Sequence, residues 1–231
     1  MRIVSIIAFA GLAVGGTASF LATPARAAQS APAEARRGQP EGRPESVVTA
    51  SAAVVQVARW IIASGDNGDL PFIIIDKSGA ALFVFGAERN LVAAAPALVG
   101  VASGDLSSPG IGDRDLAKIG PAERTTPAGR FVARYGLAAG GISVLWVDYA
   151  TSVALHPIPT ENPKERRAQR LRSPRPDDNR ITYGCINVAA RFYSKVVRPI
   201  FRRSGGIVYI LPDTQALDEV FPGLRINEYT L

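Results

Sequence analysis

The sequence predicts a mainly β domain with packed helices, in the form of a small barrel or sandwich. Between residues 70 and 213, short apolar runs recur, separated by clusters of Gly, Pro, Asn, Ser and Asp that are typical of turns. Only two segments, 50–62 and 190–203, place their apolar residues at helical spacing. The chain has 231 residues, 47% of them hydrophobic, which is enough for one good core. We therefore expect one main domain in which helices pack against a sheet.

The N-terminal residues 1–27 have the layout of a secretory signal peptide. Arg2 precedes an apolar stretch over residues 3–21, and a small-residue cleavage pattern ends at Ala27. We expect cleavage and export, with no stable membrane span afterwards; an uncleaved anchor is the alternative. Residues 28–45 contain almost nothing apolar larger than Ala, so they cannot offset the entropy of ordering. They are predicted to be a flexible tether.

Periodicity then assigns the elements in chain order. An N-terminal helix within 46–68 ends at Gly65 and is expected to pack on the main domain, 70–213. A long loop is predicted over 103–121, and residues 214–231 are expected to form a C-terminal tail. A second helix is predicted over 190–203. The strands are predicted over 72–76, 81–85, 91–99, 130–135, 142–149, 152–156 and 207–211.

Charge and composition exclude several classes of function. The formal net charge of +6 is mildly basic, which suits a cell wall or membrane surface. It is too small and too dispersed to indicate nucleic-acid binding, and no nucleic-acid motif accompanies it. One His and one Cys cannot supply the usual transition-metal ligand set, and no Gly-rich phosphate loop is present. We therefore expect no cofactor and no metal.

The single cysteine, Cys185, is the centre of the functional question. Because it has no partner within the chain, its thiol is either buried or reactive. It lies in the segment 180–188, Arg-Ile-Thr-Tyr-Gly-Cys-Ile-Asn-Val, before the second predicted helix. The only histidine, His156, ends an earlier predicted strand.

The order of strand, His, loop, Ser/Thr, any residue, Gly, Cys, any residue, Asn, helix and last strand resembles the YkuD-type L,D-transpeptidase catalytic domain. The resemblance covers roughly residues 70–213 and extends to 126–131, Thr-Pro-Ala-Gly-Arg-Phe, which is similar to the family's Thr-Pro-x-Gly-x-Phe element. Two features depart from the family. Tyr183 stands where the family usually has His before Gly-Cys, and an insertion, 161–180, lengthens the stretch that follows His156.

Chemistry gives Cys185 and His156 their roles independently of the family. A thiol is mostly protonated near neutral pH, so a nucleophilic Cys needs a base or a positive field. His156 is the only imidazole available to take the proton and to return it to a leaving amine. The resemblance implies that a backbone carbonyl next to the His orients the ring, and Pro157 can supply one. The alternatives are a thiol that is only structural and a histidine with no catalytic role.

The residues around Cys185 have candidate roles in the same reaction. Backbone N–H groups around Gly184 and Cys185 could form an oxyanion hole, to which Tyr183 could add its hydroxyl. Thr182 and Asn187 would brace the loop or bind substrate. Plain packing of Tyr183 and capping of the following helix by Asn187 are the alternatives.

The insertion 161–180 is basic, with seven Lys or Arg against four Asp or Glu. Asn162, Pro163 and Glu165 have the order of cap, first and third residues of a helix, which predicts a short basic helix above the site. It would act as a lid that meets peptide carboxylates or anionic glycan chains, or it would be a solvated loop helix.

The resemblance implies a periplasmic or cell-envelope reaction on peptidoglycan stem peptides. Cys185 would attack the L-centre carbonyl of the third residue of a tetrapeptide stem and release the terminal D-Ala. The acyl group would pass to an amine of a second stem, giving a 3-3 crosslink, to an envelope lipoprotein, or to water. The rival functions are a noncatalytic peptidoglycan-binding pseudoenzyme and an unrelated envelope protein.

Overall fold

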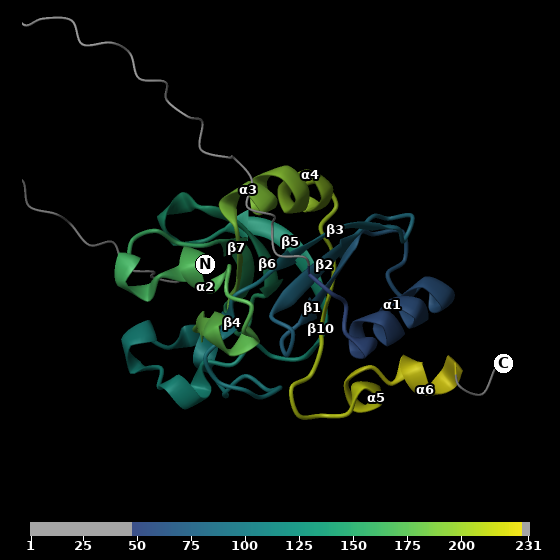
Figure 1. Ribbon diagram of the computed structural model, residues 1–231, viewed down its shortest axis with the longest axis horizontal. Coiled ribbons are helices and arrows are strands. Elements are labelled where there is room, and N and C mark those ends of the chain that lie inside the picture. Colours follow the sequence, from purple (N-terminus) through teal and green to yellow (C-terminus); the bar gives the residue numbers. More distant parts are fainter. Residues whose placement is uncertain (1–47, 228–231) are drawn as a thin grey trace, which may run out of the picture.

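The structure is a computed structural model that describes residues 48–227. The predicted signal peptide (1–27) and tether (28–45) lie outside the described residues. Ten strands in the described part form an eight-stranded sheet, ordered β3-β2-β1-β10-β5-β6-β7-β9, and a two-stranded sheet, β4-β8 (Figure 1). The strands are β1 Phe72–Asp76, β2 Ala81–Phe85, β3 Leu91–Pro96, β4 Val99–Gly100, β5 Gly129–Leu137, β6 Ser143–Asp148, β7 Val153–Pro157, β8 Arg180–Thr182, β9 Ile186–Val188 and β10 Gly206–Ile210.

The two edges of the large sheet nearly meet. Leu98, two residues beyond β3, exchanges both backbone hydrogen bonds with Asn187 of β9, at 2.8 and 2.9 Å. Three strand pairs are parallel, β1 with β10, β7 with β9 and β4 with β8. The predicted mainly β class, with a sheet closing toward a barrel and few helices, is confirmed. Asn187 therefore sits at the seam where the sheet closes.

The centre of the sheet is buried on both faces. All five residues of β1 are buried, and successive side chains point to opposite faces, as in any strand. Ile73 and Ile75 enter one core, and Phe72 and Ile74 enter the other. In Figure 1, helices α1, α5 and α6 lie on one side of the sheet and α3 and α4 on the other, so each core has a helical cover.

Helix α1 runs from Ala52 to Ser64, as the helical spacing within 46–68 predicts. Ser51 caps it by accepting the Val54 N–H at 3.3 Å, and Gly65 ends it in the left-handed conformation, φ 70°. Residues 214–227 of the expected tail contain α5 Leu217–Val220 and α6 Gly223–Asn227. Phe221 packs there against Trp60 of α1, with ring centroids 6.1 Å apart.

The helix predicted over 190–203 is divided. It consists of α3 Ala190–Phe192, a π-helical turn Tyr193–Val197 and α4 Arg198–Phe201. Pro199 has no N–H to donate, so the regular α-helical ladder cannot run through it, and a wider turn precedes it. Val197 and Phe201 remain fully buried against the sheet.

The two long connections contain short helical turns. The loop predicted over 103–121 holds 3₁₀ helices at Ile111–Asp113 and Leu116–Lys118, and a third follows at Pro121–Glu123. The insertion holds a 3₁₀ helix Pro163–Glu165, helix α2 Arg167–Arg170 and a 3₁₀ helix Pro176–Asn179. No helix among the described residues is long and apolar enough to cross a membrane.

The single helix predicted to begin at Asn162 is wrong in two respects. The Asn162 side chain makes no capping hydrogen bond, although Pro163 does occupy the first helical position. The segment is also broken at Arg166, whose φ of 50° lies in the left-handed region and ends the 3₁₀ helix before α2 begins. This reversal redirects the arginine that follows.

Candidate active site

Strand pairing brings His156 and Asn187 together. The parallel pair β7 and β9 sets His156 opposite Asn187 and Leu155 opposite Ile186. Residues opposite one another in a sheet project their side chains to the same face. Cys185 directly precedes β9, so the nucleophile predicted from sequence and its predicted base are carried by neighbouring segments.

Hydrogen bonds within the turn before Cys185 fix the conformation of that turn. The Thr182 hydroxyl donates to the Cys185 carbonyl at 2.6 Å and accepts the Gly184 N–H at 3.2 Å. Gly184 has φ 129°, and a Cβ there would lie 2.8 Å from the Thr125 carbonyl oxygen, so only glycine fits. Thr182 is 2% exposed and its hydroxyl is used in both directions. Of the two roles considered for it, the structure therefore supports bracing.

The Cys185 thiol is partly exposed and lies along the start of β7. Its Sγ donates to the Ser152 carbonyl at 3.6 Å. Burial raises the pKa of the Cys185 thiol, while the Ala154 backbone N–H and the charge of Arg167 act to lower it. Since burial dominates, the group is a protonated thiol in this state and needs a base before it can attack.

His156 is prepared as that base. Its Nδ1 lies 2.8 Å from the Pro157 carbonyl oxygen, the contact expected of the orienting group. Burial lowers the pKa of His156; Arg167 also lowers it, and the Pro157 carbonyl and Glu161 oppose the shift. The imidazole is therefore neutral near pH 7. A neutral ring with the proton on Nδ1 carries its lone pair on Nε2, where a base needs it.

The lone pair on Nε2 is not directed at the thiol. Asn187 Nδ2 lies 3.1 Å from His156 Nε2, and no hydrogen bond joins Cys185 to His156 anywhere in residues 48–227. Each member of the pair thus has another partner, Ser152 for the thiol and Asn187 for the imidazole. Catalytic hydrogen bonds are often absent before substrate binds, so this arrangement does not by itself exclude proton transfer between the two groups.

Arg167 is the site residue that sequence reasoning did not single out. Its Nη1 donates to Asn187 Oδ1 at 2.5 Å and its Nε donates to Glu165 Oε2 at 2.5 Å. The basic composition of the insertion signalled an effect on the site but did not distinguish one arginine from its neighbours. The alternative role of Asn187 as a helix cap is wrong, because Ala189 is the cap residue of α3 and Asn187 is fully buried between His156 and Arg167.

Tyr183 lies beneath a guanidinium group. The Arg124 Cζ lies 3.9 Å from the centre of the Tyr183 ring, a cation–π contact. Arg124 is held there by two hydrogen bonds to the Ile119 carbonyl, at 3.1 and 3.0 Å. The Tyr183 hydroxyl has no hydrogen-bond partner within the described chain. Tyr183 therefore contributes the face of its ring in this state.

One of the two backbone N–H groups expected to form the oxyanion hole is free to donate, and the other is not. The Gly184 N–H is already bonded to Thr182, whereas the Cys185 N–H has no partner among the described residues. The donor that remains for a developing oxyanion is therefore the N–H of Cys185 itself. A second donor would have to come from Tyr183 or from a movement of the Gly184 N–H away from Thr182.

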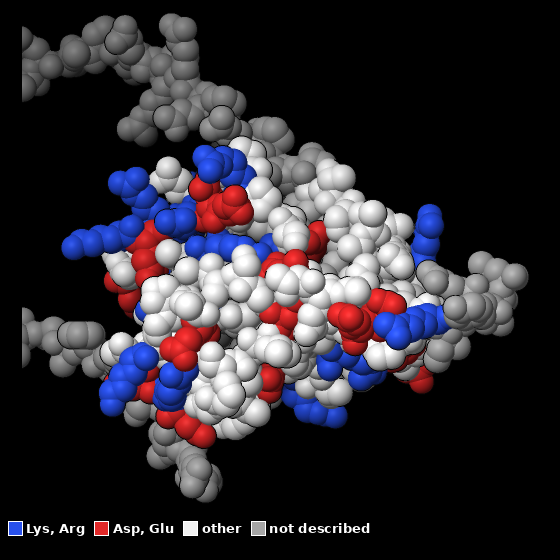
Figure 2. All heavy atoms as spheres, turned by 90° about the horizontal axis from the view of Figure 1, so that it is seen from below, with Lys and Arg blue, Asp and Glu red and all other residues white. Residues whose placement is uncertain are grey.

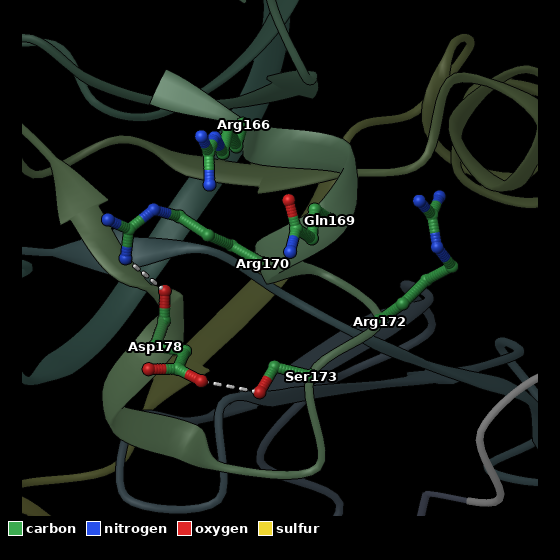
Figure 3. A pocket seen from close by; sticks show the side chains of 6 residues that line it. All are labelled: Arg166, Gln169, Arg170, Arg172, Ser173 and Asp178. Atoms are coloured by element: carbon green, nitrogen blue, oxygen red, sulfur yellow. Dashed lines mark hydrogen bonds between the residues drawn. The ribbon is translucent and has the colours of Figure 1, made fainter. Parts of the chain in front are cut away.

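The insertion encloses a cavity of about 540 Å³ beside this site. Figure 2 shows Lys and Arg side chains gathered, with acidic ones among them, at the end of the molecule that holds α2 in Figure 1. In Figure 3 the guanidinium groups of Arg166 and Arg170 lie near one another, and Arg172 points away from them. The cavity does not include Cys185 or His156, so it is a space separate from the thiol. Its lining residues are Arg166, Gln169, Arg170, Arg172, Ser173 and Asp178.

Hydrogen bonds within the insertion hold Asp178, the acidic residue of this cavity. Asp178 Oδ2 accepts the Ser173 hydroxyl at 2.6 Å, and the Asp178 carbonyl accepts Arg170 Nη1 at 2.8 Å. The side chain of Arg166 makes no hydrogen bond within residues 48–227, so its donors face the open space. No group of three or more His, Cys, Asp or Glu side chains in that part of the chain is arranged to hold a metal.

Similar solved structures include one from Bdellovibrio bacteriovorus and one from Xylanimonas cellulosilytica. No protein-family model matches the chain, and no curated protein sequence does. Bd1075 of Bdellovibrio bacteriovorus is similar over 72% of this chain and 56% of its own, with 15% identity and a TM-score of 0.40. An L,D-transpeptidase from Xylanimonas cellulosilytica is similar over 62% of this chain and 60% of its own, with 16% identity and a TM-score of 0.36. The chain thus spans less than two thirds of either protein.

Proposed function

We propose that the protein is an exported cysteine transpeptidase that acts on peptidoglycan stem peptides through an acyl-enzyme on Cys185. One observation carries the proposal. The only thiol of the chain follows a glycine turn and directly precedes β9, and the paired strand β7 carries the only imidazole, whose Nδ1 is bonded to the Pro157 carbonyl at 2.8 Å. That bond keeps the lone pair on Nε2, as a general base for Cys185 requires.

The reaction follows from these groups in two steps. His156 Nε2 takes the thiol proton while Sγ attacks the peptide carbonyl, and the N–H of Cys185 donates to the oxyanion. The C–N bond breaks, His156 returns the proton to the leaving D-Ala amine, and a thioester remains on Cys185. An acceptor amine then attacks the thioester with loss of its proton to His156, and the new amide leaves as the thiol is restored.

We also propose that the basic insertion receives a carboxylate of the stem peptide. Support comes from the cavity beside the site, where Arg166 and Arg170 present guanidinium groups toward the same space. Arginine binds carboxylates with two parallel hydrogen bonds, which fixes orientation as well as adding affinity. The periplasm or cell envelope is the compartment in which such a substrate is met, in keeping with the signal peptide predicted over 1–27.

The test is intact mass of the purified protein after mixing with a tetrapeptide-bearing muropeptide and, separately, with a carbapenem. Cys185→Ala and His156→Ala serve as controls. We expect an adduct on the native protein that is absent from Cys185→Ala, together with release of D-Ala. A dimeric muropeptide would identify an amine acceptor and a trimmed one would identify water, which makes the protein a hydrolase.

A second candidate function is a noncatalytic peptidoglycan-binding module. The observation that favours it is that His156 Nε2 is bonded to Asn187 and not to Cys185. Binding of muropeptide by a folded native protein that remains unmodified, with the muropeptide intact, would support this reading over the transpeptidase. Tyr183→His would then test whether the missing family histidine accounts for the lost activity.

A further inference from the structure

Arg167 reaches into the proposed active site from outside the core domain. It is the first residue of α2, in the insertion, and its side chain is 10% exposed. The left-handed backbone of Arg166 turns the chain just before it. Its planar guanidinium group then bonds two partners at once, Glu165 through Nε and Asn187 through Nη1. A nearly buried arginine held from two sides is a fixed feature of the site, unlike the exposed arginines around it.

Hydrogen bonds link Arg167 to Asn187, Asn187 to His156, and His156 to Pro157. The donor and acceptor of each bond follow from the chemistry of Arg167 at one end and of the Pro157 carbonyl at the other. A guanidinium group only donates, so the Asn187 atom that faces Arg167 is the amide oxygen. The amide nitrogen must then face His156 and donate to Nε2. At the other end, the Pro157 carbonyl only accepts, so His156 Nδ1 carries the hydrogen. Both ends require the same tautomer of His156.

The charge of Arg167 acts on both members of the pair. Arg167 lowers the pKa of Cys185 and also that of His156. Glu161 is the other charged group that acts on His156, and it raises that pKa; Glu165 faces Arg167 and pairs with it. Removing the arginine charge therefore leaves both Cys185 and His156 more strongly protonated at a given pH.

We propose that Arg167 is a positioning residue of the proposed active site, which fixes the Asn187 amide and through it the tautomer of His156 that carries its lone pair on Nε2. This inference rests on the proposed function for its catalytic meaning. The insertion is then part of the catalytic apparatus, because it supplies one end of the hydrogen-bonded chain. Lysine cannot replace Arg167 fully, since an ammonium group lacks the planar fork that bonds Glu165 and Asn187 together.

The composition of the chain makes the test unusually direct. His156 is the only histidine and Cys185 the only cysteine, so each gives a single signal in a protein without a tag. The nitrogen chemical shifts of ¹⁵N-labelled histidine report the tautomer of His156. The rate of iodoacetamide alkylation as a function of pH, followed by intact mass, reports the thiolate of Cys185. Neither readout requires turnover of a muropeptide.

The variants separate charge from geometry. In Arg167→Gln we expect the alkylation midpoint to rise, which lowers the alkylation rate near neutral pH. The imidazole should also lose its single tautomer. In Arg167→Lys the midpoint should stay near that of the native protein while the tautomer is still lost. Arg175→Gln removes an exposed charge from the same insertion, away from the residues that line the cavity, and should leave both readouts unchanged.

Two results would overturn the inference. One is a folded Arg167→Gln protein, by circular dichroism, with native alkylation and native imidazole shifts. The other is an equal change in Arg175→Gln, which would mean a general effect of charge. If Arg167→Gln does not fold, the tautomer in Arg167→Lys decides alone, and an unchanged tautomer there rejects the positioning role. Failure of the transpeptidase proposal is separate, because it appears as absence of a muropeptide adduct on the native protein.

Discussion

The hydroxyl of Thr126 donates a hydrogen bond of 2.8 Å to the carbonyl of Gly184, the residue before the nucleophile. The same hydroxyl accepts the Gly100 N–H, also at 2.8 Å. Thr126 opens the Thr-Pro-x-Gly-x-Phe element found in the sequence, and its position explains that element. It ties the start of β5 to the glycine turn that aims Cys185, so the geometry of the nucleophile depends on a residue 59 positions upstream.

Thr126→Val should therefore impair both stability and reactivity. Valine has a similar shape but leaves the Gly100 N–H and the Gly184 carbonyl without their partner, which costs about 1–3 kcal/mol of the free energy of unfolding. The rate of Cys185 alkylation should change as well, because the turn before it loses the hydrogen bond from Thr126. Urea unfolding and alkylation rates measure the two effects. Thr125→Val is the matched control, since the Thr125 hydroxyl makes no hydrogen bond within residues 48–227.

Lys77 supports Thr126 from behind and is the strongest candidate for a stability determinant. Its side chain is fully buried and its Nζ contacts Asp105 at 2.9 Å, the Thr126 carbonyl at 3.0 Å and Asp213 at 3.4 Å. Lys77→Met leaves the buried carboxylate of Asp105 without its cation, while Asp213 keeps Arg180 at 2.7 Å, and should cost about 3–5 kcal/mol of the free energy of unfolding. Urea unfolding tests this. The exposed Lys118→Met should change it little, and an equal loss in both variants would contradict the buried network.

The same network predicts a loss of stability in acid. Hydrogen bonds from Thr214 and Lys77, and from the Asp213 and Gln215 backbone, outweigh burial and hold the pKa of Asp105 far below its usual range. A carboxylate with a lowered folded pKa contributes stability that is complete above the unfolded pKa, about 4, and is lost as pH falls toward the folded pKa. We expect the free energy of unfolding to fall steeply below about pH 4. The Asp105→Asn variant should show a shallower decline.

Several parts of the fold were predictable because local sequence decides them. β1 and β2 have the predicted bounds, since both are continuous apolar runs closed by turn residues. β4, β8 and β9 have two or three residues each and exist only through pairing with distant segments, so they leave no pattern in the sequence. The closure of the sheet at Leu98 and Asn187 uses backbone atoms alone and is equally invisible there.

The residues of the site also divide into those that local sequence predicts and those that depend on distant contacts. The motif around Cys185 specified the glycine turn, and the position of His156 and Pro157 followed from the resemblance. Arg167 could not be chosen in advance, because seven basic residues share the insertion and only the reversal at Arg166 selects one of them. The hydrogen bond between Asn187 and His156 could not be predicted either, since it depends on the register of β7 with β9.

Tyr183 should act through its ring and not through its hydroxyl. Tyr183→Phe keeps the surface that Arg124 covers and should alter Cys185 acylation by less than about twofold, because the hydroxyl has no partner among the described residues. Tyr183→Leu removes the cation–π contact, worth about 0.5–1 kcal/mol, and should lower the acylation rate more than Tyr183→Phe does, although the Ile119 carbonyl still holds Arg124. Carbapenem acylation rates compare the two. A loss of tenfold or more in Tyr183→Phe would mean that the hydroxyl belongs to the oxyanion hole.

The pH dependence of acylation should show an unusually broad plateau. Burial lowers the pKa of His156 and raises that of Cys185, so the reactive state is a neutral imidazole beside a protonated thiol and spans the pH range between the two values. The acid limb, set by protonation of the imidazole, should lie below the ordinary histidine value of about 6.5. Carbapenem acylation rates across pH measure it. An acid limb above that value would contradict the assignment of His156 as a neutral base.

A change at Glu161 should shift the acid limb of the pH profile of acylation in a known direction. Its charge raises the pKa of His156, so Glu161→Gln should lower it and extend acylation to still more acidic pH. Glu88→Gln makes the same change of charge in the exposed turn between β2 and β3 and should leave the limb in place. The alkaline side should stay where it is in both variants, because Glu161 is not among the groups that act on Cys185. A limb that moves equally in the two variants would instead indicate a response to net charge, and His156 would lose its place as the group that sets it.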